Sequence, residues 1–501
     1  MRRIYLSLLM LLGSIYANAY DIELNGLYYS YINEGRELEF DSCNAGTQVL
    51  VIPDEVTYHD RSRNVTAVGA NACNKDSSII SIAIPNTVTK IGNNAFARTS
   101  IQTLIIPSSV VSIGDFAFSG CKSLVSVQFG SNVKTIGDLA FFYCTGLTKV
   151  TLPVNLERLG SEAFGNCTAL TEIDIRSGNI VKLCEVPNVR KLTIGPKVNS
   201  LNALADFKRQ GKYLEELWID DLFSWCNLSL KAPLPLHEVS SGTSTKIYVG
   251  GKPVGILQIP DGVTKITKSI FNNWPITGVN VPNSVTELED GCFANNHQLT
   301  NVVLGAGVTV IPDRCFENSG VNSIQISATL KSIGARAFYG NKFPTITLPN
   351  TLKKIGCMAF MNSKLTAVTI PNSVKIVGAG AFMNCTDLNA ADINCDTLDV
   401  NAFKNDKNLK RITLGPNVKH FAQTIIDSDP KFASQFTDGE IFKGCPLMNI
   451  ISYIENPFPF AQNMFEKDTY YNASLMIPGG TMNRYKSQDF WSAFIYAQAM
   501  K

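Results

Sequence analysis

Apolar positions recur along this chain in a long period that repeats many times. The stretch at residues 106–129, IPSSVVSIGDFAFSGCKSLVSVQF, has related stretches directly before and after it, and each contains one central phenylalanine. A period of roughly 20 to 29 residues is typical of a solenoid, in which each repeat forms one coil and the coils stack. Within two blocks, neighbouring copies of the central residue are at most 23 positions apart: Phe96, Phe118, Phe141 and Phe164, and then Phe271, Phe293, Phe316, Phe338, Phe360, Phe382 and Phe403.

A second, shorter period lies inside each repeat. In SLVSVQF the apolar residues Val127 and Phe129 alternate with polar ones, and the next repeat has Val150 and Leu152 at the matching positions. Alternation of this kind predicts a strand with one buried face. Proline then turns the chain, a short apolar run follows, and glycine allows a second tight turn before the phenylalanine. We therefore predict coils with two extended segments and a core that the phenylalanine fills.

These patterns predict a β-rich solenoid, a single elongated right-handed superhelix with an N-terminal β cap and a short C-terminal helical cap. The coils should be about 22 to 23 residues long. The pair Gly250 and Gly251 is typical of a hairpin turn, and the last 27 residues or so predict a strand, a turn and an amphipathic helix. The expected organisation is a signal peptide at 1–19, a cap with the first strands at 20–67, a regular array at 68–175, irregular long coils at 176–258, a second regular array at 259–414, and degenerate repeats with a cap at 415–501.

The N-terminus predicts export. Arg2 and Arg3 precede an apolar run of about a dozen residues, and the small residues Ala17 and Ala19 follow it. This is the pattern of a secretory signal peptide, with cleavage expected after Ala19. No other segment has the roughly 18 apolar residues that a membrane-spanning helix needs. We expect an extracellular or cell-surface protein, with the periplasm as the alternative.

Thirteen cysteines in an exported chain raise the question of disulfides. Many of them follow the repeat, however, and free cysteine packs as a small buried hydrophobe. We therefore favour a column of buried thiols over disulfide pairs, which remain the alternative, and the odd number agrees with this preference. No C-x-x-C pair indicates a zinc or redox site. The cysteines in register with the repeat are Cys121, Cys144, Cys167, Cys385 and Cys445, three residues after a phenylalanine, and Cys292 and Cys315, directly before one.

The repeat resembles that of the BspA-like leucine-rich repeat proteins of gut and oral anaerobic bacteria, whose unit is similar to IPxxVxxIGxxAFxxCxxLxxVxI. The resemblance is dense at about 84–175 and 259–414. It implies an exported or surface-displayed solenoid, and some members of that family are implicated in adhesion to host matrix proteins or to other microbes. One departure is Cys73, which stands where the first phenylalanine of the array would be.

Catalytic, metal and cofactor chemistry finds little support in the sequence, and we expect none of the three. The four histidines are scattered, without a neighbour at metal or triad spacing. Glu215, Glu216, Asp220 and Asp221 could form a carboxylate pair of a glycan hydrolase, but a solvated acidic edge is the preferred interpretation. The net charge of +2 and the 17% of charged residues argue against nucleic acid or an anionic membrane as a partner.

The outward side of the regular strands is the main candidate for binding, because solenoids use such extended faces. Threonine is also a good exposed strand residue, so the same pattern has a purely structural explanation. As an alternative platform, Trp218 and Trp225 in the irregular middle could stack on a sugar ring, although buried filler is the preferred interpretation of both. The candidate residues of the outward strand side are Gln128, Lys149, Thr151, Glu172, Asp174, Gln325, Thr347, Thr369 and Arg411.

Three functional hypotheses follow from the sequence. The first is a non-catalytic, exported leucine-rich repeat protein that binds a protein on a host or microbial surface across its strands. The second is a glycan-binding surface component that uses the aromatic middle. The third is a polysaccharide-degrading solenoid enzyme, and it would need acids and bases clustered on adjacent coils, which the sequence does not contain. Exposure of Trp218 and Trp225 would favour the second hypothesis over the first, and burial would count against it.

Overall fold

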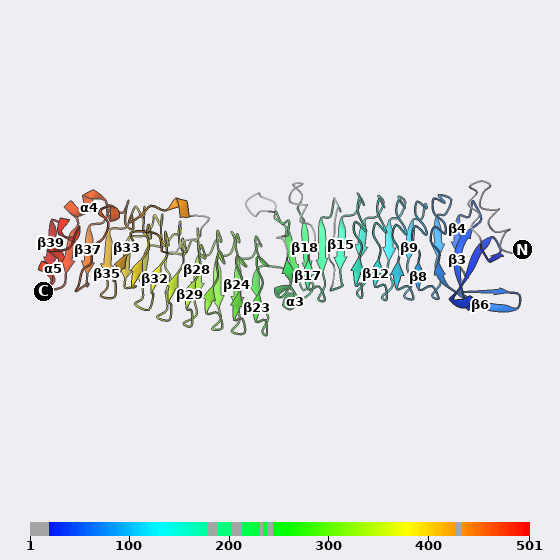
Figure 1. Cartoon of the computed structure of the whole chain (residues 1–501), viewed down its shortest axis with the longest axis horizontal. Coiled ribbons are helices and arrows are strands. Elements are labelled where there is room, and N and C mark those ends of the chain that lie inside the picture. The colour runs from blue at the N-terminus through cyan, green and yellow to red at the C-terminus, as the bar shows by residue number, and fades with distance from the viewer. Residues whose placement is uncertain are drawn as a thin grey trace, which may run out of the picture. The chain divides into compact units, whose positions relative to one another are not determined.

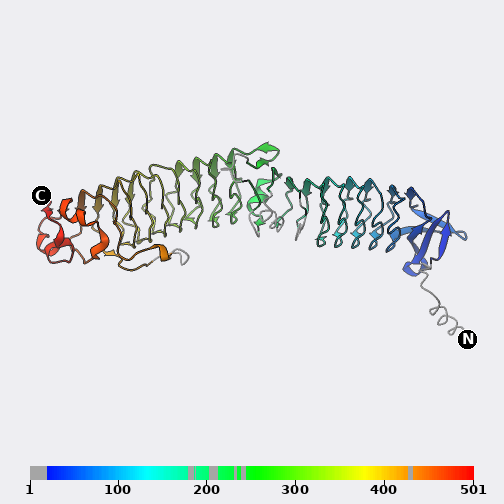
Figure 2. The same ribbon diagram turned by 90° about the horizontal axis from the view of Figure 1, so that it is seen from above.

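The structure is a computed structural model that describes residues 20–178, 186, 188–201, 213–230, 234–237, 244–426 and 433–501. The expected signal peptide and Cys184 lie outside the described residues. The fold is a β-solenoid, as the repeat predicts. The chain divides into two compact units, Met1–Ile173 with Ile180–Val189 and Asp174–Asn179 with Arg190–Lys501. Most coils contribute one strand to a front row and one to a back row (Figures 1 and 2). The term "strand face" below means the outward side of the front row.

The first unit begins with an antiparallel meander that passes into parallel back strands. Strand β2 (Leu27–Ile32) pairs antiparallel with both β1 (Ile22–Leu24) and β3 (Glu37–Cys43), and β3 pairs in parallel with β6 (Arg61–Val68). Strand β5 (Glu55–Tyr58) forms a hairpin with β6. The remaining back strands follow in parallel, one per coil: β8 (Lys90–Ile91), β10 (Ser112–Ile113), β12 (Thr135–Ile136) and β14 (Arg158–Leu159).

The front strands of this unit are three residues long and parallel. Their central residue is buried, or half-buried in β11, and the two that flank it are exposed, for example in β9, where Leu104 is buried between exposed Thr103 and Ile105. The period-two alternation in the sequence therefore has the predicted meaning. The front strands are β4 (Val49–Val51), β7 (Ser81–Ala83), β9 (Thr103–Ile105), β11 (Ser126–Gln128) and β13 (Lys149–Thr151), and β15 (Glu172–Ile175) lies at the division between the units.

The second unit repeats the same arrangement with more coils. Its front strands are β16 (Lys191–Ile194), β18 (Glu216–Ile219), β20 (Lys246–Val249), β22 (Ile256–Gln258), β24 (Gly278–Val281), β26 (Asn301–Leu304), β28 (Ser323–Gln325), β31 (Ala367–Ile370), β33 (Ala390–Ile393), β35 (Arg411–Leu414), β37 (Asn449–Ser452), β38 (Ser474–Ile477) and β39 (Tyr496–Ala499). Its back strands are β17 (Ser200–Leu201), β19 (Ser229–Leu230), β23 (Lys265–Ile266), β25 (Glu287–Leu288), β27 (Val310–Ile311), β29 (Ser332–Ile333), β30 (Lys354–Ile355), β32 (Ile376–Val377), β34 (Thr397–Leu398) and β36 (His420–Phe421).

Helices are few and short in the described residues. The α-helices are α3 (Leu222–Cys226), α4 (Lys467–Asn472) and α5 (Met482–Lys486), and the 3₁₀ turns are η2 (Asn33–Gly35), η4 (Ala433–Gln435), η5 (Gln462–Met464) and η6 (Trp491–Ala493). The expected hairpin at Gly250 and Gly251 is confirmed, because β20 pairs antiparallel with β21 (Lys252–Pro253). The C-terminus differs from expectation. After β38 the helical segments are the short α5 and the 3₁₀ turn η6, and the chain ends in β39, which pairs in parallel with β38.

The phenylalanine of each repeat forms a continuous stack inside each unit. In the first unit the ring centroids of Phe96, Phe118, Phe141 and Phe164 follow one another at 5.2–5.5 Å. In the second unit the spacing is 5.0–5.6 Å, with the planes at most 17° apart. These separations lie in the favourable range for aromatic pairs. The second stack comprises Phe271, Phe293, Phe316, Phe338, Phe360, Phe382, Phe403, Phe442 and Phe465.

A ladder of buried donors runs beside the stack, and it explains the periodic cysteines. Three residues after a phenylalanine, a side chain donates a hydrogen bond to the carbonyl of the phenylalanine one coil earlier. Cys121 donates to Phe96 at 3.2 Å, and Asn341 donates to Phe316 at 2.7 Å. The expected column of free, buried thiols is confirmed for the described residues, where only Cys43 is half-buried. The other donors of this kind are Cys144, Cys167, Ser319, Cys385 and Cys445.

We predict that Phe118→Ala lowers the free energy of unfolding by about 3–5 kcal/mol, because it removes one ring from a close-packed stack and leaves a cavity. The matched control is Phe116→Ala in the same turn, where the ring is 40% exposed and the change should stay within about 0.5 kcal/mol. Urea unfolding of both variants checks this. Equal losses in the two variants would contradict the central role of the stack.

Asp406 takes the donor position in one coil and is poorly suited to it as a carboxylate. It is fully buried, and Oδ1 accepts a hydrogen bond from the Cys385 amide at 2.7 Å, whereas Oδ2 has no partner among the described residues. Burial raises the pKa of Asp406 well above its usual value. The folded state therefore holds a proton that the unfolded state releases. The stability that Asp406 contributes is complete below about pH 4, the pKa of an unfolded aspartate, and is lost as pH rises toward the higher folded-state pKa.

We predict that Asp406→Asn removes this pH dependence and stabilises the protein at pH 7 by about 1 kcal/mol or more, because asparagine has no proton for the unfolded state to release and one unit of pKa difference corresponds to about 1.4 kcal/mol. Asparagine fits the position, since in other coils Asn296 accepts from the Trp274 amide and Asn341 donates to Phe316. Unfolding free energies measured from about pH 4 to about pH 8 check the change in slope. The reverse control, Asn341→Asp, should create such a slope, and an unaltered slope in Asp406→Asn would refute the assignment.

Candidate binding surface on the strand face

The candidate residues from the sequence lie on the strand face of the two units. In the first unit Gln128 and Thr151 are exposed, and Lys149 forms an ion pair with Glu172 at 3.4 Å. These residues lie on neighbouring strands, because Ser126 of β11 is in register with Lys149 of β13.

The candidate residues of the second unit differ in their surroundings. Asp174 forms an ion pair with Arg176 at 2.7 Å, which gives that carboxylate a structural partner. Gln325 and Arg411 are exposed on β28 and β35. Thr347 and Thr369, in contrast, line the same hollow, so these two candidates are brought together.

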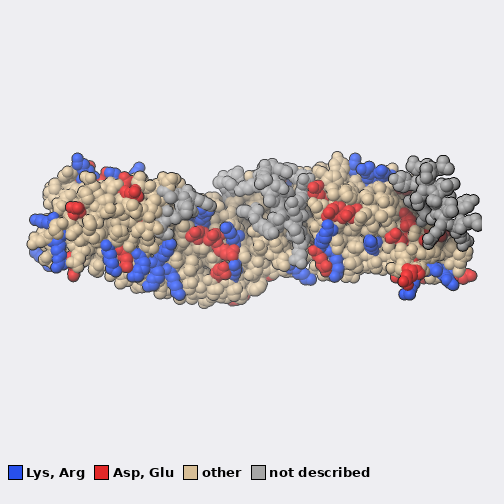
Figure 3. Space-filling model, viewed as in Figure 1, with Lys and Arg blue, Asp and Glu red and all other residues tan. Residues whose placement is uncertain are grey.

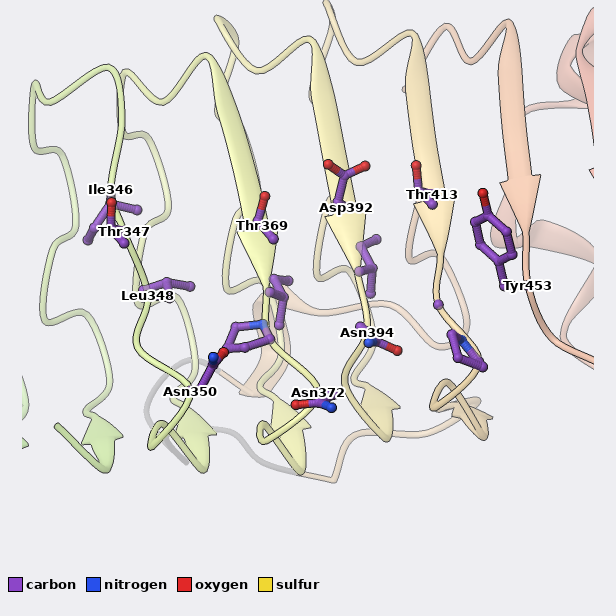
Figure 4. A pocket seen from close by; sticks show the side chains of 15 residues that line it. Ile346, Thr347, Leu348, Asn350, Thr369, Asn372, Asp392, Asn394, Thr413 and Tyr453 are labelled. Atoms are coloured by element: carbon purple, nitrogen blue, oxygen red, sulfur yellow. The ribbon is translucent and has the colours of Figure 1, made fainter. Parts of the chain in front are cut away.

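The hollow has a volume of about 680 Å³ and spans the front of several consecutive coils (Figure 4). Its outward row consists of Thr347, Thr369, Asp392 and Thr413, and Tyr453 stands at the end of the row. Backbone pairing sets the row, because Thr369 is in register with Asp392, and Asp392 with Thr413. The small side chains in the middle and the large ring at the end make this part of the strand face concave.

Apolar residues form the floor of the hollow, and amides form one rim. Ile370 and Ile393 are at most 1% exposed and belong to the core. The rim amides come from the turn after each front strand and include Asn372 and Asn394. Asn394 is held in place, since its Oδ1 accepts a hydrogen bond from the Asn417 amide at 3.2 Å. Gly415 makes room for it, because a Cβ there would lie 2.1 Å from that same Oδ1.

Local sequence explains why the hollow interrupts a regular sheet. The coil that carries Thr347 forms no front strand, so the front row has no strand between β28 and β31. Pro344 lies at the start of this segment and has no amide hydrogen to donate to the ladder. Its carbonyl still accepts a hydrogen bond from the Thr366 amide at 2.8 Å, so the coil remains attached on one side.

The rim was missed by the sequence analysis, which considered only the strands. The sequence did contain a signal for the rim. Asn350 and Asn372 each directly follow a proline, and the two asparagines are 22 residues apart, which is one repeat. Tyr453 could not have been found this way, because the coil between β35 and β37 is longer than the others. Hydroxyl and amide groups donate and accept hydrogen bonds, and Asp392 adds a negative charge, so the hollow suits a polar ligand that is neutral or positively charged.

The two tryptophans of the alternative platform differ in their surroundings. Trp225 on α3 is 1% exposed and packs against Trp274 at 5.7 Å between ring centroids. Its ring cannot reach a sugar, so the preferred interpretation of Trp225 as buried filler is confirmed, as a helix between two coils has to bury one face. Trp218 on β18 is half-buried.

Both faces of the Trp218 ring are occupied. Tyr248 stacks on it at 4.1 Å with the planes 15° apart, and the Lys191 ammonium lies 4.7 Å from the ring centre. These neighbours come from the strands on either side of β18. Sugar stacking needs a free ring face, and Trp218 offers only an edge, so the platform finds no support.

The acidic residues near the tryptophans have structural partners. Asp221 caps α3 by accepting a hydrogen bond from the Ser224 amide at 2.9 Å, which lowers the pKa of its carboxyl against the opposing effect of burial. Asp220 pairs with Arg176, and Glu215 with Arg190. In the described part of the chain, no three or more His, Cys, Asp or Glu side chains are grouped so that they could hold a metal ion. No helix there is long and apolar enough to cross a membrane.

Comparison with known protein families decides the identity of the repeats. Six copies of the BspA type leucine-rich repeat region match the chain, at residues 66–185, 251–341 and 309–432. The chain belongs to the BspA-type leucine-rich repeat family. The matched residues include the coils that form the hollow up to Thr413. The chain matches no curated protein sequence.

Several solved structures are similar to this BspA-type protein. A leucine-rich repeat protein from Bacteroides ovatus is 21% identical, with 80% of this chain and 96% of that chain covered and a TM-score of 0.44. A leucine-rich cell surface protein from Faecalibacterium prausnitzii is 21% identical, with coverages of 78% and 93% and a TM-score of 0.36. The pneumococcal vaccine antigen PcpA is 19% identical, with coverages of 91% and 98% and a TM-score of 0.30.

We predict that Trp218→Phe removes most of the tryptophan emission that acrylamide can quench, because Trp225, Trp274 and Trp491 are each 1% exposed. Trp225→Phe should remove only shielded emission, and it is the matched control. Acrylamide titrations of both variants check this prediction. Loss of the quenchable emission in Trp225→Phe would show that this ring is accessible and would restore the platform.

Proposed function

We propose that this BspA-type leucine-rich repeat protein is an exported, non-catalytic binding protein that holds a segment of a partner protein in the hollow of its strand face. The proposed role is adhesion to host matrix or to another microbial surface. The observation that carries the proposal is the hollow itself, which joins Thr347 and Thr369 with Asp392, Thr413 and Tyr453 on consecutive coils. Its volume falls within the range of roughly 300 to 1,000 Å³ that ligand sites occupy.

The lining of the hollow supports an extended polypeptide as the ligand. Threonine hydroxyls and asparagine amides recur at one-coil intervals of about 4.8 Å, and they can pair with backbone amides and carbonyls of a bound segment. Asp392 favours a segment with a basic residue. Tyr453 is 47% exposed and supplies the large amphipathic ring that is typical of protein-binding surfaces. Gln325 and Arg411 would extend the contact beyond the hollow.

Export and the absence of catalysis belong to the same proposal. Export rests on the N-terminal pattern that ends at Ala19. The lining of the hollow contains a single carboxyl group, that of Asp392, whereas glycoside hydrolysis uses a pair of carboxyl groups. A binding role therefore accounts for the hollow better than a polysaccharide-degrading one does.

We predict that the purified protein binds at least one protein on an array of extracellular-matrix proteins and purified glycans, and that Thr347→Glu with Thr369→Glu weakens that binding at least about tenfold. Two added carboxylates beside Asp392 would repel an approaching backbone carbonyl or acidic group. The control is Ser126→Glu, an exposed position on the strand face of the first unit that is outside the hollow. Binding that survives the double substitution, or binding to glycans alone, would overturn the proposal.

A further inference from the structure

A row of lysines lies on the back of the second unit, away from the strand face. The residue directly before each back strand is lysine in β29, β30, β32 and β36, namely Lys331, Lys353, Lys375 and Lys419. We call these four residues the lysine row. Lys354, the first residue of β30, lies next to it. Figure 3 shows the resulting gathering of basic side chains around β29 and β32.

Backbone hydrogen bonds fix the spacing of the row. The Lys353 amide donates to the Lys331 carbonyl at 2.7 Å, and the Lys375 amide donates to the Lys353 carbonyl at 2.8 Å. Asp396 takes the next position, and the Lys419 amide donates to its carbonyl at 2.9 Å. Lys331, Lys353 and Lys375 are therefore direct neighbours in the ladder, about 4.8 Å apart, and Lys419 follows one coil beyond Asp396.

Charge is poorly balanced along this row. Asp396 occupies the ladder position between Lys375 and Lys419, and it forms ion pairs with Lys375 at 3.2 Å and with Lys419 at 3.4 Å. These two lysines hold the pKa of Asp396 below its usual value against the opposing effect of burial, so it stays ionised at neutral pH. Within the described residues, the ammonium groups of Lys331 and Lys353 make no ion pair or side-chain hydrogen bond.

The first unit shows that the fold does not require this charge. Lys134 occupies the equivalent position, since the Lys134 amide donates to the Val111 carbonyl and the Lys134 carbonyl accepts from the Glu157 amide. There the charge is neutralised across the coils, because Lys134 pairs with Glu157 at 2.9 Å. Like charges on directly opposed strand residues are destabilising. A row of lysines in the second unit therefore needs a partner to explain it.

We propose that the lysine row binds a linear acidic polysaccharide, one whose carboxylate or sulfate groups recur along the chain. Lys331, Lys353 and Lys375 repeat at a constant interval of one coil. Such a line of point charges matches a polymer with a repeating anion, and lysine ammonium groups are point charges. Single-stranded nucleic acid would require aromatic platforms for its bases, and the row contains no Phe, Tyr or Trp. The proposed ligand is distinct from the protein partner of the hollow.

The row and the hollow are close along the chain. Asn350 and Asn372 of the hollow's rim precede Lys353 and Lys375 by three residues, within one turn. The row lies at the back strands and the hollow at the front of the same coils, so a polysaccharide bound to the row would leave the strand face available. Because the two surfaces use different residues, each can be tested while the other is intact.

The experiment measures binding of the purified protein to fluorescein-labelled heparin, to polygalacturonate and to a single-stranded DNA oligonucleotide, with dextran as the uncharged control. Heparin carries sulfate groups and polygalacturonate carries only carboxylates, so the two arms distinguish a sulfated source from a uronic-acid source. We expect binding to at least one of them that weakens steeply with added salt, and no binding to dextran.

Variants assign the binding to the row. Lys353→Gln with Lys375→Gln should weaken polysaccharide binding about tenfold or more, as expected for the loss of two lysines from a polybasic site. The matched control, Lys134→Gln, should leave it within about twofold, because Glu157 already neutralises that charge. Thermal unfolding checks that both variants fold. Unchanged binding in the double variant, binding to neither polysaccharide, or tighter binding to the oligonucleotide would each overturn the proposal.

Discussion

The stacked phenylalanine is the interaction on which the rest of the structure depends. Each coil is too short to bury a core of its own, and a solenoid becomes stable only when neighbouring coils share one. Ring-to-ring distances of 5.0–5.6 Å in both units show that every regular coil places its ring on the preceding one. The ladder of donors to phenylalanine carbonyls satisfies the polar backbone beside the rings, which a buried turn requires.

Because the core and the turns stabilise the fold, the outward-facing positions of the strands are under little structural constraint. Since the inner residues and turns secure the fold, the front and back strands can vary their exposed side chains from coil to coil without a large effect on stability. The second unit uses this freedom twice. Its front has the hollow that Thr369 and Asp392 line, and its back has the lysine row. The two surfaces differ in charge and shape, so they suit ligands of different chemistry.

Irregular coils mark where the repeat gives way to other packing. In the second unit α3 buries Trp225, and Asp221 caps that helix, so residues that could have formed a sugar site instead close a gap in the core. At the C-terminus Phe490 adopts a left-handed conformation with φ of 66°, and Trp491 and Phe494 after it are buried. Phe494 lies edge-on to Phe465, the last ring of the stack, at 5.7 Å between ring centroids, and thereby helps to cover the open end of the core.

The sequence by itself determined the coil, the core and the family. A period of about 22 residues is carried by the identity of single residues such as Phe118 and Cys121, and alternation identifies the buried side of each strand, because both depend only on local geometry. It also placed Thr347 and Thr369 on the strand face. The tertiary structure decided which of those residues share a hollow, that Asn394 and Tyr453 complete it, and that Trp225 is core. These outcomes depend on coil length, on a missing donor at Pro344 and on which residues stack across coils, and none of these is set by the residues next to each position in sequence.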